Sequence, residues 1–246
     1  MCAKAKQPLR KDFIEKLGLS ARTDVHCGAV CVYPNRVPDC VDALKGSGVG
    51  LASVAAGFPA GQTPMPIRIE EIKQAVAAGA TEIDIVISRE HVIAQNWQAL
   101  YDETKAMRAA CGAARLKCIL AVGELPSMRD VYKASIITMM AGADFIKTST
   151  GKEAINATMS VGILMARAVR EYHERTGFYV GFKPAGGIRS AKDATAWLSM
   201  MYEELGEEWT HPNLFRIGAS ALLADIERQI EHGLSSRYAA LYYMPM

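Results

Sequence analysis

The sequence predicts a single α/β domain with the architecture of a (β/α)8 barrel, and three observations lead to this fold class. Short apolar runs of strand length alternate strictly with longer segments of helical periodicity, which is typical of a parallel sheet covered by helices. The 246 residues show no linker and no break in composition, so we expect one domain over residues 1–246. Ionisable residues in apolar surroundings fall on the expected strands, where a barrel carries its active site.

Seven strand–helix units are expected along the chain, one fewer than a complete barrel contains. The strands are expected to begin near residues 29, 51, 82, 116, 145, 179 and 214. The helices are expected over residues 9–18, 37–46, 67–78, 97–110, 128–141, 159–175, 191–205 and 221–231. Local breakers mark several ends, since Gly18 ends the first helix and Pro34 stops the first strand. The tail over residues 235–246 is rich in tyrosine and shows no clear pattern.

A lysine lies in the middle of the fifth expected strand, within the segment Asp144–Lys152. Side chains of a strand alternate between its two faces, so Phe145, Lys147 and Ser149 share one face. Burial of a lysine disfavours its charged form, lowers its pKa and leaves a neutral amine, which is a nucleophile. The alternative is a structural lysine that extends from the strand end to solvent.

A second mid-strand lysine, Lys183, follows 36 residues later and precedes a glycine-rich turn. This spacing is about the length of one strand–helix unit, so two neighbouring parallel strands would direct two amines into one site. Each ammonium makes the other easier to deprotonate, which is how lysines that form Schiff bases are activated. Considered alone, Lys183 is equally compatible with a structural role.

Two further ionisable residues, Asp84 and Lys117, are expected to face the barrel interior by the same alternation, whereas Ile83 and Ile85 face the helices. Buried charges that persist in a fold are usually paired or catalytic. Asp84 is therefore expected to pair with an interior lysine or to transfer a proton, and the two roles are compatible. Lys117 is interpreted as an electrostatic neighbour of the site rather than as a reacting group.

Composition and motifs argue against several classes of function. A net charge of +2 gives no basis for nucleic-acid binding, and no apolar run approaches the roughly 20 residues of a membrane span. Six cysteines without a Cys-x-x-Cys pair, and an N-terminus without a signal-peptide core, indicate free thiols in the cytoplasm. Neither Gly46–Gly50 nor Gly151–Lys152 fits a nucleotide-binding loop, and the histidines and cysteines lack metal-ligand spacing, so no cofactor or metal is expected.

The segments that carry the two lysines resemble those of the 2-deoxyribose-5-phosphate aldolase family, whose members are class I aldolases with a (β/α)8 TIM barrel. They read Phe-Ile-Lys-Thr-Ser-Thr-Gly-Lys at 145–152 and Gly-Phe-Lys-Pro-Ala-Gly-Gly-Ile-Arg at 181–189. Supporting stretches extend the resemblance over nearly the whole chain, at residues 29–34, 57–62, 82–87, 116–125 and 215–223. The stretch 54–63 is more similar to animal members than to bacterial ones.

The resemblance implies a Schiff-base aldolase that reversibly cleaves 2-deoxy-D-ribose 5-phosphate into D-glyceraldehyde 3-phosphate and acetaldehyde, without a cofactor. It implies that Lys147 forms the Schiff base, that Lys183 lowers the pKa of Lys147 and joins a proton relay, and that Asp84 transfers protons. The phosphate ligands that it implies are Thr150, Gly151, Lys152, Gly186, Gly187, Gly218 and Ser220. Lys117 and Cys31 are expected to support the site.

One part of the family pattern has no counterpart: the first strand, with an Asp-Leu-Thr segment, is not found before residue 29, which explains the count of seven. A barrel without one strand exposes two sheet edges, which invite fraying, pairing with another chain or aggregation, and the pairing is compatible with a homo-oligomer. Two alternatives stay open. One is a truncated, inactive barrel that binds a phosphate or a partner, and the other is a different Schiff-base sugar-phosphate lyase.

Overall fold

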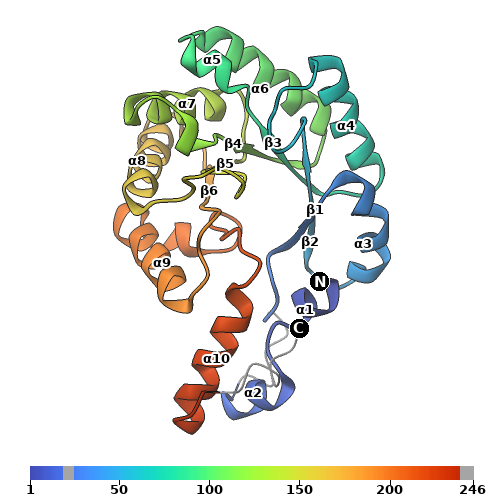
Figure 1. Ribbon diagram of the computed structural model, residues 1–246, viewed down its shortest axis with the longest axis vertical. Helices are drawn as coiled ribbons and strands as arrows, with labels where there is room; N and C mark the ends of the chain where they lie inside the picture. The colour runs from blue at the N-terminus through green and yellow to red at the C-terminus, as the bar shows by residue number, and fades with distance from the viewer. Residues whose placement is uncertain (19–24, 239–246) are drawn as a thin grey trace.

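A parallel sheet of six strands forms the centre of the structure, a computed structural model that describes residues 1–18 and 25–238. Each strand pairs with the next one along the chain. The strands are β1 (Ala29–Val32), β2 (Gly50–Ala55), β3 (Glu82–Val86), β4 (Arg115–Ile119), β5 (Phe145–Lys147) and β6 (Gly181–Lys183). The sheet is curled and helices surround it (Figure 1), so the strands form an open half of a barrel.

Ten α-helices are seen in the described ranges, and eight of them correspond to predicted helices. They are α1 (Cys2–Lys6), α2 (Lys11–Lys16), α3 (Val37–Leu44), α4 (Met65–Ala77), α5 (Arg89–Ile93), α6 (Trp97–Cys111), α7 (Met128–Met140), α8 (Met159–Thr176), α9 (Ala191–Leu205) and α10 (Leu222–Ser235). Helices α1 and α5 were not predicted, because each has five residues, too few to show a helical period. Among the described helices, none combines the length and the apolar character that crossing a membrane requires.

The seventh strand predicted near residue 214 is wrong, because within the described residues this segment joins β6 through isolated bridges. The amide of Phe182 donates to the carbonyl of Leu214 at 2.8 Å, and the amide of Arg216 donates back to Phe182 at 3.2 Å. The next position of the ladder is Pro184, which has no N–H to donate. Pairing returns at Gly218, whose amide donates to the Pro184 carbonyl at 2.9 Å. The proline therefore interrupts the ladder before a regular strand can form.

A buried carboxylate brings the two ends of the described chain together. Glu227 of α10 is fully buried and accepts a hydrogen bond from Lys4 Nζ at 3.1 Å and from the backbone amide of Arg10 at 3.3 Å. Helix α10 extends away from the barrel beside α2 (Figure 1). Of the predicted irregular tail, residues 239–246 lie outside the described residues. The six cysteines all lie within the described ranges and are free thiols, as predicted.

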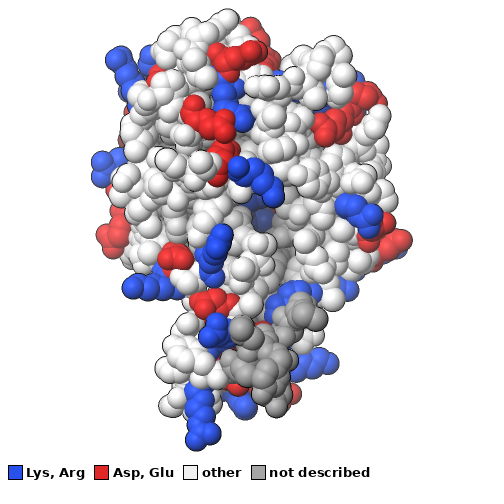
Figure 2. Space-filling view, in the orientation of Figure 1, with Lys and Arg blue, Asp and Glu red and all other residues white. Residues whose placement is uncertain are grey.

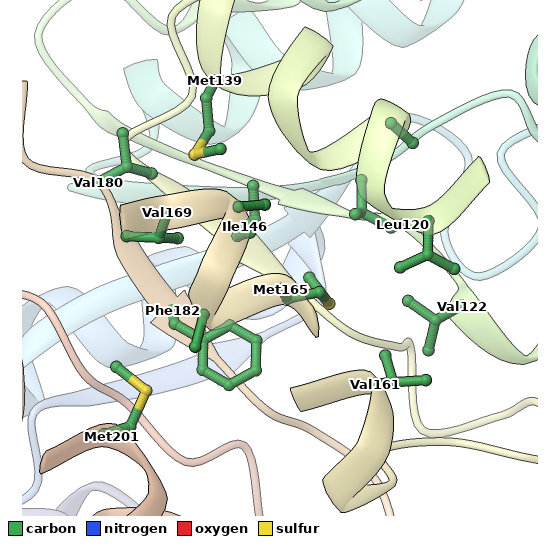
Figure 3. Packing of buried hydrophobic residues seen from close by; sticks show 14 of the residues in the cluster. Leu120, Val122, Met139, Ile146, Val161, Met165, Val169, Val180, Phe182 and Met201 are labelled. Carbon is green, nitrogen blue, oxygen red and sulfur yellow. The ribbon is translucent and has the colours of Figure 1, made fainter. Parts of the chain in front are cut away.

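Apolar side chains fill the space between the sheet and the helices. One core cluster joins β5 and β6 to α7, α8 and α9, and it includes Ile146, Met165 and Phe182 (Figure 3). A second cluster packs β1 to β4 against α3, α4 and α6. Ile146 and Phe182 are the chain neighbours of Lys147 and Lys183, so burying them against the helices directs both lysines into the barrel interior.

Gly181 packs directly against the ring of Phe145, and a β-carbon added at Gly181 would overlap this ring. We expect Gly181→Ala to lower the free energy of unfolding by about 1–3 kcal/mol through overpacking, measured by chemical denaturation. Gly233→Ala is the control, since Gly233 lies in α10 with nothing within 4 Å of an added β-carbon. There we expect a gain of about 0.5–1 kcal/mol. Equal losses in both variants would contradict this account of the contact.

Candidate active site

The inner faces of β3 to β6 bring four ionisable side chains into one buried cluster. Asp84 on β3 is the register partner of Lys117 on β4, and Lys147 on β5 is the register partner of Lys183 on β6. Each of these residues is 7% exposed or less. We refer to Asp84, Lys117, Lys147 and Lys183 as the lysine–aspartate cluster. The inward orientation predicted for Asp84 and Lys117 is confirmed.

Asp84 is the centre of the lysine–aspartate cluster and binds all three amines. Its Oδ1 accepts a hydrogen bond from Lys117 Nζ at 2.6 Å. Its Oδ2 accepts from Lys147 Nζ at 2.8 Å and from Lys183 Nζ at 2.7 Å. Because Asp84 is fully buried, these charge-assisted hydrogen bonds take the place of water around the carboxylate.

Burial favours the neutral form of Lys147, and the neutral form is the nucleophilic form of an amine. Burial lowers the pKa of Lys147 below the ordinary value, and the Lys183 ammonium acts in the same direction, against the opposing effect of Asp84. Burial alone would raise the pKa of Asp84, but the three neighbouring lysines outweigh it and hold that pKa well below its usual range. The site therefore combines an amine that loses its proton easily with a carboxylate that stays charged.

Lys183 is shifted in the opposite direction from Lys147. Burial disfavours its ammonium form, but Asp84, Cys31 and Glu82 together outweigh burial, and the pKa of Lys183 is raised. Cys31 and the Glu82 carboxylate act in the same direction as Asp84 on the pKa of Lys183. Environments that push two neighbouring titratable groups apart in pKa separate a base or nucleophile from an acid. Cys31, on β1, is exposed.

One member of this charged region, Glu82, was missed in the sequence analysis. It is the first residue of β3, and its carboxylate lies 2.6 Å from Lys117 Nζ. The available signal was strand alternation, because Glu82 and Asp84 are two positions apart on one strand and therefore share a face. Lys117 consequently lies between two buried carboxylates.

Glycine turns at the carboxyl ends of the strands lie next to one another. A β-carbon built on Gly151 would lie 4.0 Å from the Cα of Gly186, and one built on Gly218 would lie 3.5 Å from Lys183 Cε. Gly151, Gly186 and Gly187 have φ values of +85°, +87° and +88°, in the region that favours glycine. The structure thus brings the glycines of three predicted phosphate-binding segments to one end of the barrel.

The loop after β5 already holds an anion of its own, the carboxylate of Glu153, which the sequence analysis did not single out. The amide of Thr150 donates to it at 3.0 Å and 3.1 Å, and the hydroxyl of Thr150 donates at 2.7 Å. The amide of Lys152 donates to the same carboxylate at 3.2 Å. Backbone amides that converge in a turn form an anion-binding concavity. Glu153 therefore occupies donors that the sequence analysis expected for a phosphate.

Two buried polar atoms near these loops have no hydrogen-bond partner among the described residues: Ser149 Oγ and Asn156 Oδ1. Ser149 follows β5, two positions after Lys147. The side chain of Asn156 lies against Gly186, where an added β-carbon would clash with it. Buried polar atoms in native proteins normally have partners, so both are suited to contact a bound substrate. Ser220 is exposed just before α10, and the structure shows no hydrogen bond for its side chain in the described part of the chain.

Charges of both signs are interspersed over the face drawn in Figure 2, in keeping with the small net charge. A hollow near the middle of this face contains atoms of Lys or Arg. The arrangement of the site can bind a carbonyl compound covalently through an amine, move protons through a carboxylate, and hold an anion with backbone amides.

Comparison with known proteins shows similarity to aldolases. Residues 5–228 match a family described as DeoC/LacD family aldolase. The chain is 59% identical to the deoxyribose-phosphate aldolase of Homo sapiens over 248 residues, which cover 100% of this chain and 78% of that protein. A solved structure described as QR15, an aldolase, is 27% identical with a TM-score of 0.69 and covers 93% of this chain and 92% of its own. The fold is also that of a deoxyribose phosphate aldolase from Aeropyrum pernix, described as a unique tetrameric structure (TM-score 0.64, 22% identity, 92% and 85% covered).

Proposed function

The chain belongs to the DeoC/LacD family of aldolases, and we propose that it cleaves 2-deoxy-D-ribose 5-phosphate through a Schiff base on Lys147. The products are D-glyceraldehyde 3-phosphate and acetaldehyde, and the reaction is reversible. One observation supports this mechanism above the others. Asp84 binds a lysine of lowered pKa, Lys147, and a lysine of raised pKa, Lys183, through the same carboxylate oxygen.

The first step needs a neutral amine at Lys147. Its Nζ attacks the aldehyde carbon C1 of the open-chain sugar, and loss of water from the adduct gives an iminium ion. Lys183 is charged and donates the proton that the departing hydroxyl requires. The nitrogen of the iminium is Lys147 Nζ, which lies 2.8 Å from Asp84 Oδ2. The Asp84 carboxylate therefore stabilises the positive charge of the iminium.

Cleavage of the C2–C3 bond follows. A base removes the proton of the C3 hydroxyl, C3 becomes the aldehyde of glyceraldehyde 3-phosphate, and the bonding electron pair moves through C2 into the iminium to form an enamine. The enamine is then protonated at C2, and water releases acetaldehyde from Lys147. In our proposal Asp84 carries these protons through Lys183 or a water molecule, and the iminium is the electron sink.

The phosphate of the substrate is proposed to bind the glycine turns at the carboxyl ends of the strands, next to the lysine–aspartate cluster. The amides of Gly151, Gly186 and Gly187, the region of Gly218 and the ammonium of Lys152 supply the donors and the positive charge that a dianion requires. Thr150 and Ser220 are assigned hydroxyl contacts on the same grounds. This position lies at the carboxyl ends of the strands, where barrels bind phosphate.

Glu153 is expected to compete with the substrate phosphate for the amides of Thr150 and Lys152. Glu153→Ala should therefore lower KM for deoxyribose 5-phosphate about two- to fivefold, the effect of one partly exposed charge, with little change in kcat. Steady-state kinetics measure this, and inhibition by inorganic phosphate should strengthen by the same factor. If the carboxylate instead serves to hold the loop, KM will rise, which would contradict the competition.

Product analysis with several sugar phosphates tests the proposed substrate against the alternatives. We expect deoxyribose 5-phosphate to be cleaved to acetaldehyde at a higher kcat/KM than fructose bisphosphate or sedoheptulose 7-phosphate. Preference for another sugar phosphate would favour a different Schiff-base lyase. A sample without turnover and with a non-cooperative melt by circular dichroism would favour an inactive barrel.

We further infer that the protein acts in the cytoplasm as a single domain and assembles with copies of itself. Its free thiols suit a reducing compartment. In the described residues, β1 pairs with β2 alone, and an open strand edge favours pairing between chains. Light scattering coupled to size exclusion tests the assembly, and a mass of 26.7 kDa at all concentrations would contradict it.

A further inference from the structure

A row of buried charges continues from the lysine–aspartate cluster toward the amino ends of the strands. Glu82 lies two positions before Asp84 on the same face of β3 and is 5% exposed. Lys117 Nζ lies 2.6 Å from the Glu82 carboxylate and 2.6 Å from that of Asp84. Lys117 is 1% exposed, so these two carboxylates, and not water, are the partners of its Nζ. A change of charge at Glu82 therefore alters the electrostatic environment of Asp84, the carboxylate that binds Lys147 and Lys183.

The other side of Glu82 faces a cavity of about 310 Å³ at the amino ends of the strands. Arg115 of β4 and Arg216 line this cavity, and their guanidinium nitrogens lie 3.7 Å and 3.4 Å from Glu82 Oε1. His26 lies beside the cavity, against Gly48. Glu82 thus separates two arginines of the cavity wall from the buried lysines.

We infer that Glu82 is a positioning residue that sets the protonation of the lysine–aspartate cluster from the amino-terminal end of the barrel. The inference rests on the Schiff-base function proposed above. Buried charges are tolerated when they are balanced. Two carboxylates, Glu82 and Asp84, face three lysines and two arginines, so positive charge is in excess and a neutral form of one buried amine is favoured.

The assignment of the neutral amine to Lys147 agrees with the surroundings of each lysine. Lys183 faces Asp84, Lys147 and Cys31 and is also within the electrostatic reach of Glu82, which helps to raise its pKa. Lys147 faces Asp84, Lys183 and Cys31, and its pKa is lowered by burial. Glu82 therefore favours the state in which Lys183 is charged and Lys147 is the nucleophile.

Glu82→Gln tests the inference because it keeps the shape of the side chain and removes its charge. Without this carboxylate the pKa of Lys183 should fall. Because charged Lys183 is the proposed proton donor, the loss of activity at alkaline pH should then begin at a lower pH than in the parent. We expect a shift of the alkaline limb of about one pH unit, which gives a loss of at most about threefold in kcat near pH 10 and approaches tenfold only above the parental limb. KM should change less than about twofold, because Glu82 lies at the amino ends of the strands, away from the proposed phosphate-binding turns at their carboxyl ends.

Glu103→Gln is the matched control. Glu103 is 8% exposed and pairs with Arg68 at 2.9 Å, so it is an equally buried carboxylate in an ion pair, but it lies on α6 outside the barrel. We expect Glu103→Gln to lower stability and to leave the alkaline limb in place. Glu82→Asp retains the charge and should restore the parental limb. Should Glu82→Gln fold poorly, the double variant Glu82→Gln with Arg216→Gln removes opposite charges together and should still show the shifted limb.

The outcomes separate this inference from the proposed function. If the parent forms a borohydride-reducible adduct on Lys147 and the limb of the Glu82 variants coincides with the parental one, the inference is overturned and the function stands. The same holds if Glu103→Gln shifts the limb as far as Glu82→Gln does. If the parent forms no adduct, the proposed function fails and the inference fails with it.

Discussion

Lys147→Ala is expected to lower kcat/KM for deoxyribose 5-phosphate by at least about a thousandfold, because it removes the nucleophile. Asp84 and Lys183 remain in place in this variant, so any residual rate measures what binding and proton transfer achieve without the Schiff base. In the parent, incubation with deoxyribose 5-phosphate or acetaldehyde followed by borohydride reduction should leave a stable adduct. Digestion and mass spectrometry should locate the adduct on the peptide that contains Lys147, and it should be absent without substrate.

The matched control is Lys105→Ala, which removes an exposed lysine of α6 that is not part of the buried cluster. Its kcat/KM should stay within about twofold of the parental value, as for most surface substitutions. Full activity of Lys147→Ala would refute the mechanism. An adduct on Lys183 in place of Lys147 would mean that the two lysines have exchanged roles. No adduct in a cooperatively folded sample would mean that this chain does not perform the chemistry of its relatives.

Asp84→Asn is expected to lower the free energy of unfolding at neutral pH by about 3–5 kcal/mol, the effect of breaking a buried ion pair on one side. The fully buried Asp84 carboxylate binds Lys117, Lys147 and Lys183 at 2.6 to 2.8 Å, and the amide of asparagine cannot balance their charges. Chemical denaturation at several pH values measures the loss. Asp102→Asn, which alters an exposed side chain bonded to Gln98, should change stability by less than about 0.5 kcal/mol.

The pH dependence of this loss has a definite sign. The folded-state pKa of Asp84 is depressed, so its contribution to stability is complete above the unfolded-state pKa of about 3.9 and is lost as the pH falls through the folded-state value. In Asp84→Asn the buried lysines have lost their partner, so their pKa values fall and the folded state binds fewer protons than the unfolded state. Stability of the variant should therefore rise from neutral pH toward about pH 10 more steeply than that of the parent. Parallel curves for the two proteins would contradict the role of Asp84 as the counter-charge.

The fold class and the inward position of the lysine–aspartate cluster follow from local patterns in the amino-acid sequence. Strand–helix alternation requires a parallel sheet with covered faces, and the period of two along each strand sends Lys147 and Lys183 inward when Ile146 and Phe182 are buried outside. These are local rules that depend on neighbours in the chain. The roles of the site residues remain predictions that the experiments above test.

Which groups meet in the site, and where strand pairing ends, depends on contacts between residues far apart in the chain. Asp84 and Lys183 are 99 positions apart, and the carboxylate that binds three amines exists because four strands align in one register. The same applies to Glu82, whose place in the site depends on Lys117 of the next strand. The seventh strand was wrongly predicted because its apolar pattern suits a strand, while its neighbour carries Pro184 where the ladder needs a donor. A hydrogen-bond ladder depends on both of its strands, so one strand's own sequence cannot establish that the ladder forms.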